Sequence, residues 1–398
     1  MKTNKSNGTV FYSLINITYF MAFCTIHAFA AVYLLDKGFS NMIVGVLLAV
    51  ANVASALLQP VIASLIDKFV KITNRGVCVT SALIIALGAV LLLFVDSNQI
   101  VVFIVFTIMY MTQFTYMPVL TALSFEYQGK GMYIFYGLAR GLGSAGFAVT
   151  SMFMGTLVEN RGVNMLLYAT ILAMLVHATL LFFFKAPECE EKSDSETAQS
   201  DSLSLVEFFK TYPVFAILLL ATTLLFFTHN MLNDYLIQII RNIGGTESHL
   251  GYATFLAALL ELPTMAIVSA VSKKADMKKL LIFAGVFFTV KSLIMLFAVN
   301  MILVYISQAM QMFAYAVFIP ASAYYVSENI SINDQVKGQA LITSCFTLAG
   351  VFSSLVCGAI LDNLDVHAML VTGVFVSIVG TVTIVIAMVK SHSQKEKP

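Results

Sequence analysis

Three charged residues lie inside long apolar segments of the sequence: Arg140, Glu261 and Lys291. An ionised side chain at the centre of a bilayer costs about 2.5–3.5 kcal/mol on insertion scales. Such residues are retained where they face a water-filled cavity, pair with one another, or both. We interpret the three as a functional site, and the alternative is an ion pair that only fixes helix packing.

Glu261 is the candidate for carrying or gating a proton, and Lys291 would tune it. Low-dielectric surroundings favour a neutral carboxyl group, whereas a nearby cation favours the carboxylate. This opposition suits reversible protonation. Alternatively, Lys291 or Arg140 holds Glu261 permanently ionised, which would suit substrate binding. Pro263 follows Glu261 closely and predicts a kink with exposed backbone carbonyls.

Polar and aromatic residues recur at helical spacing on five apolar segments, so that each set shares one helix face. Each residue alone is also explained by an interhelical hydrogen bond. For His27, a proton switch and a packed neutral imidazole both remain open. The candidate substrate contacts on these faces are Asn16, His27, Gln113, Arg140, Phe147, Asn230, Asp234, Gln311 and Tyr315.

The composition identifies the elements that must position these residues. Of 398 residues, 59% are hydrophobic and 11% charged, whereas soluble domains have about 45–50% and 25%. A soluble, disordered, collagen-like or coiled-coil protein is therefore excluded, and a polytopic membrane protein is predicted. The net charge of +1 gives no indication of nucleic-acid binding.

Several motifs of enzymes and cofactor proteins are absent or out of context. The run from Gly141 to Gly146 matches G-x-G-x-x-G, but it lies in an apolar helix without the preceding strand that a nucleotide site requires. No phosphate-binding loop, catalytic triad motif or paired cysteine spacing occurs. We therefore expect no enzyme activity, no metal and no cofactor, with the proton gradient as the energy source.

The apolar segments predict an all-α integral membrane protein with twelve transmembrane helices. If the N-terminus is cytoplasmic, 17 of the 22 Lys and Arg residues lie inside and three outside, as the positive-inside rule requires. Both termini are then cytoplasmic. The predicted spans are residues 10–36, 42–66, 77–95, 99–124, 132–158, 164–185, 211–240, 248–272, 279–298, 301–327, 337–361 and 367–389.

An acidic, Ser-rich stretch divides the chain into two six-helix halves. We predict an N-terminal bundle at 1–186, a cytoplasmic linker at 187–209, a C-terminal bundle at 210–390 and a cytoplasmic tail at 391–398. Three short motifs recur at offsets of 203 to 207 residues, which indicates a parallel internal repeat. Secondary transporters place their substrate site near the midplane between such repeats.

Twelve spans, two halves and an acidic central linker resemble the major facilitator superfamily. The segment from Gln59 to Lys68 resembles the cytoplasmic signature loop of that superfamily, although its usual glycine is replaced by Ala63 or Ser64. The resemblance implies two pseudo-symmetric bundles. It also implies a gating role for Asp67 and Lys68, with Asp67 in a charge contact that closes the cytoplasmic side.

A nearer resemblance is to the lactose permease branch of oligosaccharide:proton symporters. It is carried by Tyr33–Asp36, Gln59-Pro60, the segment from Gly137 to Phe147, Gly251–Thr254, and Ala284-Gly285 with Lys291. The resemblance implies that Arg140 binds sugar, that Phe147 lies against the sugar ring, and that Lys291 belongs to the coupling network.

The sequence departs from that branch where its members handle the proton. The proton-handling histidine and glutamate of span ten align with Gln311 and Ala314, and the glutamate of span eight aligns with Ala258. Glu261 lies one turn later. The substrate-binding glutamate aligns near Ala122, and the stacking tryptophan is Phe147. Lactose itself is therefore not the expected substrate, and any coupling must involve Glu261, Lys291, Arg140 or His27.

These observations favour a secondary active transporter working by alternating access. The leading hypothesis is a monomeric, proton-coupled symporter of a small polar solute, preferably a sugar or oligosaccharide, in the plasma membrane. The alternatives are proton-antiport efflux of drugs or metabolites and symport of nucleosides or organic acids. The expected partners are the solute, protons and the lipid bilayer.

Overall fold

The computed structural model describes residues 8–69, 71–95, 98–186, 204–271 and 275–395. Every regular element in this part of the chain is a helix, and twelve helical segments are long and apolar enough to cross a membrane. The predicted all-α membrane fold with twelve spans is confirmed. The predicted linker at 187–209 lies outside the described residues up to 203, and its last part begins a short helix, α9 (Leu205–Thr211).

The first six spans are built from eight α-helices and one π-helical turn. They are α1 (Thr9–Phe23), η1 (Cys24–Ala28), α2 (Ala30–Asp36), α3 (Asn41–Lys68), α4 (Asn74–Phe94), α5 (Gln99–Thr115), α6 (Met117–Gly129), α7 (Tyr136–Arg161) and α8 (Asn164–Phe183).

The last six spans follow α9 and again contain more elements than spans. They are α10 (Pro213–Asp234), α11 (Leu236–Asn242), α12 (Glu247–Val271), α13 (Met277–Leu296), α14 (Met301–Ala309), the 3₁₀ turn η2 (Met310–Met312), α15 (Tyr315–Asn329), α16 (Gln335–Asn363) and α17 (Val366–Lys395). The helix α17 thus continues into the predicted tail.

Short polar side chains start many of these helices. Ser40, Thr73, Asn98 and Asn300 each accept a hydrogen bond from a backbone N–H in the first turn of the following helix. Ser204 and Glu207 form a reciprocal capping box on α9, and the hydrogen bonds from Ser204 lower the pKa of Glu207. These caps satisfy N–H groups that a helix end leaves free.

Four spans are interrupted, and they are corresponding spans of the two halves of the sequence. Span one is broken at Phe29, span four at Tyr116, span seven at Tyr235 and span ten around η2. The sequence patterns predicted uninterrupted helices here. Interrupted spans free backbone groups and mark the binding regions of many transporters.

The break in span four has an identifiable cause. Pro118 has no N–H to donate to the carbonyl of Phe114, so the helical hydrogen bond at this turn is lost. Gln59 Nε2 donates to the freed Phe114 oxygen at 3.3 Å, and Tyr19 Oη donates to the Gln113 carbonyl at 2.7 Å. Side chains of α3 and α1 thus satisfy the carbonyls at the break, as a membrane interior requires.

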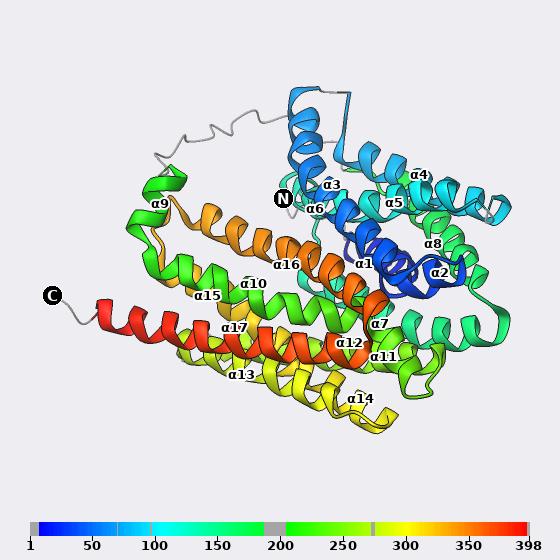
Figure 1. The fold of residues 1–398 in the computed structure, drawn as a ribbon. Coiled ribbons are helices and arrows are strands. Elements are labelled where there is room, and N and C mark those ends of the chain that lie inside the picture. Colours follow the sequence, from blue (N-terminus) through cyan, green and yellow to red (C-terminus); the bar gives the residue numbers. More distant parts are fainter. Residues whose placement is uncertain (1–7, 70, 96–97, 187–203, 272–274, 396–398) are drawn as a thin grey trace. The chain divides into compact units, whose positions relative to one another are not determined.

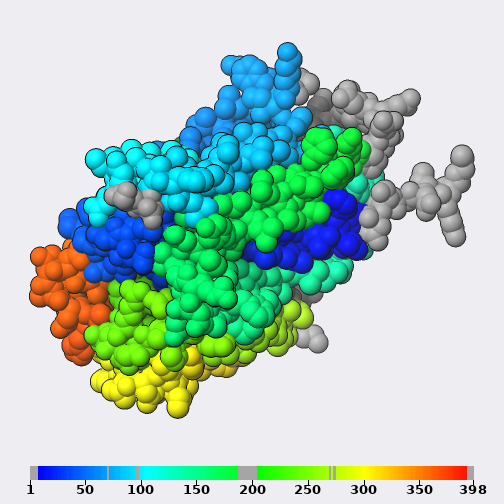
Figure 2. All heavy atoms as spheres, turned by 90° about the vertical axis from the view of Figure 1, so that its right-hand side faces the viewer, coloured from blue at the N-terminus to red at the C-terminus, as the bar shows by residue number. Residues whose placement is uncertain are grey.

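The chain forms two compact units, of which unit 1 comprises residues 1–194 and 246–258, and unit 2 comprises residues 195–245 and 259–398. The helix α12 supplies its first part to unit 1 and its second part to unit 2. In unit 1, α1 packs against α7 and α8, and α4 packs against α8 and α5. Figure 2 shows α8 (green) lying along both α1 (dark blue) and the cyan segment that includes α4.

Unit 2 repeats these contacts with the corresponding spans. The helix α10 packs against α16 and α17, and α13 packs against α17 and α15. Figure 1 shows α10 running alongside α16 and α17. Spans one, five and six therefore correspond to spans seven, eleven and twelve in packing as well as in order, which agrees with the internal repeat predicted from sequence motifs.

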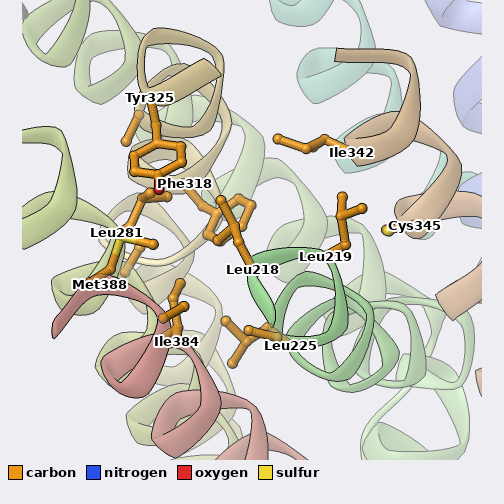
Figure 3. Close-up of a cluster of buried hydrophobic side chains, with 14 of the residues drawn as sticks. Leu218, Leu219, Leu225, Leu281, Phe318, Tyr325, Ile342, Cys345, Ile384 and Met388 are labelled. Carbon is orange, nitrogen blue, oxygen red and sulfur yellow. The ribbon is translucent and has the colours of Figure 1, made fainter. Parts of the chain in front are cut away.

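The core of unit 2 is a cluster of buried aliphatic and aromatic side chains at the contacts of α10, α13, α15, α16 and α17. Figure 3 shows its centre, with Leu218 and Leu225 of α10 close to Phe318 of α15 and Ile384 of α17. Lipid is as apolar as these side chains, so close packing is the main source of their stabilisation.

Glycines allow one especially close helix contact in unit 1. A Cβ atom on Gly155 of α7 would lie 2.5 Å from the Glu247 carbonyl oxygen, and one on Gly251 of α12 would lie 2.4 Å from the Ser151 carbonyl oxygen. Ser151 Oγ also donates to the Gly251 carbonyl at 3.2 Å. The two backbones approach so closely because neither glycine carries a side chain.

Candidate functional site

The guanidinium group of Arg140 on α7 is held by groups of unit 1. It lies over the ring of Phe20, 4.1 Å from the centroid, and its Nη1 donates to Ser144 Oγ at 3.0 Å. Arg140 forms no ion pair with any described residue. Its position is thus fixed by a ring face and a hydroxyl group, and its charge is not neutralised by a described protein carboxylate.

Aromatic rings continue from Phe20 along the same face of span one. Phe20 packs on Phe23 with centroids 5.8 Å apart, and Phe23 stacks on His27 at 4.1 Å with an interplanar angle of 15°. Phe147 of α7 packs against Phe23 at 6.2 Å. The structure therefore brings three of the predicted contacts, Arg140, Phe147 and His27, into one aromatic cluster, with Phe20 and Phe23 between them.

His27 lies in the π-helical turn η1, enclosed by rings of spans one and four. Besides Phe23, it contacts Tyr110 at a centroid distance of 3.8 Å and Phe114 at 4.4 Å. Both ring nitrogens are shielded from solvent and have no hydrogen-bond partner among the described residues. The side chain is packed, but its hydrogen-bonding capacity is unused.

Asn16 and Gln113, the other predicted contacts of unit 1, both donate hydrogen bonds to backbone carbonyls of the protein. Asn16 is buried and donates to the Tyr12 carbonyl at 2.9 Å. Gln113 is fully buried and donates to the Tyr19 carbonyl at 3.1 Å. In this conformation both side chains make helix contacts, with only Gln113 Oε1 left without a partner.

In unit 2, Gln311 connects the two predicted coupling residues. Lys291 Nζ donates to Gln311 Oε1, and Gln311 Nε2 donates to Glu261 Oε1. Lys291 is 1% exposed and Gln311 7% exposed. The amide is oriented with its carbonyl toward the cation and its NH₂ group toward the carboxylate, so its two ends hydrogen-bond to groups of opposite charge.

The neighbouring elements hold this chain of groups in place. Ser307 Oγ of α14 donates to the Lys291 carbonyl at 2.8 Å, which ties span ten to span nine beside the lysine. Gln311 itself lies in the 3₁₀ turn η2, where the regular helix of span ten is interrupted. A side chain at such an interruption can reach partners on two other helices.

The remaining predicted contacts of unit 2 are Tyr315, Asn230 and Asp234, and the sequence analysis missed a further residue of this region, His229. His229 stacks on Tyr315 at 4.7 Å and 5°. Asn230 Nδ2 donates to the Phe346 carbonyl at 3.3 Å, and Asp234 Oδ2 accepts from Ser354 Oγ at 3.4 Å. An alignment of the two halves of the sequence would have pointed to His229. His27 lies 202 residues before it, which is close to the repeat offsets of 203 to 207.

The predicted gating residues lie apart from these groups. Asp67 and Lys68 are exposed at the end of α3, and Lys68 Nζ lies 5.6 Å from the centroid of the Phe69 ring. Asp67 makes no ion pair with any described residue. Its role in a closing contact stays a prediction.

Charged side chains within twelve apolar helical spans, several of them interrupted, are typical of a membrane transporter. The chain belongs to the MFS_1 like family, whose model matches residues 10–372. Its family and fold are those of transporters and not of enzymes, and it is an integral, multi-pass membrane protein with a small-molecule substrate.

Two kinds of relative extend over nearly the whole chain. The maltose permease of Geobacillus stearothermophilus is 24% identical over 394 residues, covering 98% of this chain and 95% of that protein. Crystal structures of the nucleoside transporter NupG are similar in fold at 14% identity. A mutant of NupG has a TM-score of 0.82 and covers 95% of this chain and 99% of that one. A second structure has a TM-score of 0.78, covering 96% and 98%. These likenesses confirm the predicted major facilitator fold.

Proposed function

We propose that this protein is a proton-coupled symporter of a small, neutral polar solute, with sugars or oligosaccharides as the favoured class. The observation that carries the proposal is the hydrogen-bonded chain of Lys291, Gln311 and Glu261 in unit 2. The buried ammonium group of Lys291 stabilises the ionised form of Glu261 through Gln311, so that protonation of Glu261 changes the charge balance of the cluster.

Glu261 takes the proton in this mechanism. When Glu261 is ionised, the Gln311 NH₂ group donates to it and Lys291 balances its charge. When Glu261 is protonated, that balance is lost and the ammonium group of Lys291 loses its counter-charge. The two protonation states therefore favour different arrangements of these helices, which is what coupling a proton to a conformational change requires.

Arg140 and the aromatic cluster of unit 1 bind the solute. The guanidinium group presents several N–H donors, of which one is used by Ser144. Phe147, Phe23 and Phe20 offer ring faces beside it. Planar donors next to aromatic faces suit a hydroxylated ring, whose polar edges and apolar faces match the two kinds of group.

The relation to a maltose permease supports a sugar over other solutes. Efflux of drugs by proton antiport remains the competing mechanism, since many aromatic side chains also suit apolar solutes. The plasma membrane as location, a monomeric state and the cytoplasmic placement of both termini belong to the same proposal.

Substrate-driven proton movement in proteoliposomes tests the proposal. A panel of maltose, other oligosaccharides, nucleosides and organic acids is added outside, and the pH of the external medium is recorded. Symport predicts alkalinisation with at least one solute, and a sugar is expected to give the largest signal. Proton release on adding an apolar drug, with no response to the panel, would replace symport by antiport.

A further inference from the structure

Each unit contains one histidine packed against one tyrosine, and the two pairs correspond in the internal repeat. His27 and Tyr110 lie on spans one and four, whereas His229 and Tyr315 lie on spans seven and ten. The histidines are 202 residues apart and the tyrosines 205. In each unit the histidine ring packs against the tyrosine ring, at a centroid distance of 3.8 Å for His27 and Tyr110 and 4.7 Å for His229 and Tyr315.

A phenylalanine accompanies each pair on the helix that carries the histidine. Phe23 stacks on His27 at 4.1 Å, and Phe226 packs near His229 at 5.5 Å. Phe23 and Phe226 are themselves 203 residues apart. Three residue types thus recur at nearly one offset, and in each unit their rings touch.

The imidazole nitrogens of both pairs have hydrogen-bonding capacity that no described residue uses. Both nitrogens of His27 and Nδ1 of His229 are shielded from solvent and have no partner. Buried polar atoms are nearly always paired in native proteins, because an unpaired one loses the hydrogen bonds it made in water. Their pairing is therefore expected to come from a molecule that binds here.

The hydrogen bond of His229 defines what such a molecule must offer. Asn233 Nδ2 lies 3.0 Å from His229 Nε2, and an NH₂ group can only donate. A neutral His229 ring then carries its proton on Nδ1, which needs an acceptor. A neutral His27 ring has one donor and one acceptor unused, which together match a hydroxyl group and a neighbouring oxygen.

We propose that the two pairs, His27–Tyr110 in unit 1 and His229–Tyr315 in unit 2, are repeat-related subsites, each of which binds a neutral ring that bears vicinal hydroxyl groups. No described carboxylate or cation hydrogen-bonds to either imidazole, so the nitrogens themselves suit the hydroxyl groups of a neutral solute. A free glycoside and the ribose of a nucleoside share this chemistry. The inference rests on the proposed transport function.

Substituting each imidazole by a ring of similar shape tests the subsites. His27→Phe and His229→Phe remove the nitrogens and keep the aromatic packing, and exchange of labelled solute across proteoliposomes gives KM and the maximal rate. We expect KM to rise about 3- to 10-fold in each variant, as for loss of one or two neutral hydrogen bonds. His367→Phe, at an exposed histidine of α17, is the matched control with unchanged KM.

Deoxy analogues of the transported solute make the test specific. The arms of the experiment are a maltose series and a nucleoside series, each with its deoxy forms. If His27 binds a hydroxyl group, one deoxy analogue is transported with the same KM by the wild type and His27→Phe. An unchanged KM in both variants, or an equal rise for every analogue, would overturn the subsites.

Thermal stability separates binding from a merely structural role. His27 donates to and accepts from no described residue, so His27→Phe is expected to leave the melting temperature unchanged or raise it. A large fall in melting temperature would show that the imidazole serves packing and would overturn its binding role. If the wild type moves no sugar and no nucleoside, the proposed function fails first, before the subsites are tested.

Discussion

The two units differ in how the charge within their spans is balanced. In unit 2, Lys291 is connected through Gln311 to Glu261, so a cation and an anion are linked within the protein. In unit 1, Arg140 rests on Phe20 and Ser144 and pairs with no described carboxylate. A balanced pair suits reversible protonation, whereas an unbalanced cation suits a ligand that brings its own acceptors.

The largest effect is expected when the charge balance of unit 2 is removed. Glu261→Gln keeps the shape of the side chain but cannot release a proton, so concentrative uptake is expected to be lost while exchange of solute across the membrane continues. Counterflow and proton-driven accumulation in proteoliposomes measure the two activities separately. Glu328→Gln, at an exposed glutamate of α15, is the control. Full accumulation by Glu261→Gln would remove Glu261 from the proton role.

The next largest effect is expected on KM when Arg140 of unit 1 is changed. Arg140→Lys keeps the charge but loses the planar guanidinium group that lies on Phe20 and donates to Ser144. We expect KM to rise about 10- to 100-fold, as for loss of hydrogen bonds to a charged group worth about 1.5–3 kcal/mol. The number of protons per solute should stay the same.

The matched control for this change is Arg161→Lys, at the exposed end of α7. Initial rates of uptake give KM, and simultaneous recording of solute and proton fluxes gives the stoichiometry. If Arg140→Lys altered the stoichiometry while KM stayed at the wild-type value, Arg140 would take part in proton coupling and not in solute binding.

A smaller effect is expected on stability where α7 meets the first part of α12. Gly155→Ala places a methyl group against the Glu247 carbonyl and the Gly251 backbone, which should cost about 1–3 kcal/mol through overpacking. Gly141→Ala, on the same helix, meets nothing within 4 Å and should be neutral. Melting in detergent measures both. Equal melting temperatures would contradict the close contact that assigns this part of α12 to unit 1.

The sequence was sufficient to predict the number and type of the spans, because length and hydropathy determine which segments cross a membrane. The interruptions of spans one, four, seven and ten were not predicted. Pro118 was visible in the sequence, but the Gln59 side chain that satisfies the freed carbonyl of Phe114 lies 55 residues away. Such partners depend on tertiary packing, which periodicity on one helix does not report.

The candidate site was predictable as a set of residues and much less so as a set of contacts. The cost of an intramembrane charge identified Arg140, Glu261 and Lys291, and the structure links the last two. The orientation of Gln311 between them was not predictable, because a stripe of polar residues gives a helix face but not which partner each side chain reaches. His229 was missed because span seven was not compared with span one, its counterpart in the internal repeat.

The smallest expected effect tests what holds Arg140 in unit 1. Phe20→Leu keeps an apolar side chain on span one but removes the ring face under the guanidinium group. A cation–π contact contributes about 0.5–1 kcal/mol at an exposed site and more where it is desolvated, so KM should rise about 2- to 5-fold. Phe20→Tyr, which retains a ring face, should restore most of the affinity. Recovery by tyrosine but not by leucine would show that the aromatic face positions the cation. If leucine and tyrosine behaved alike, Ser144 alone would hold Arg140, and the aromatic cluster would serve the solute rather than the arginine.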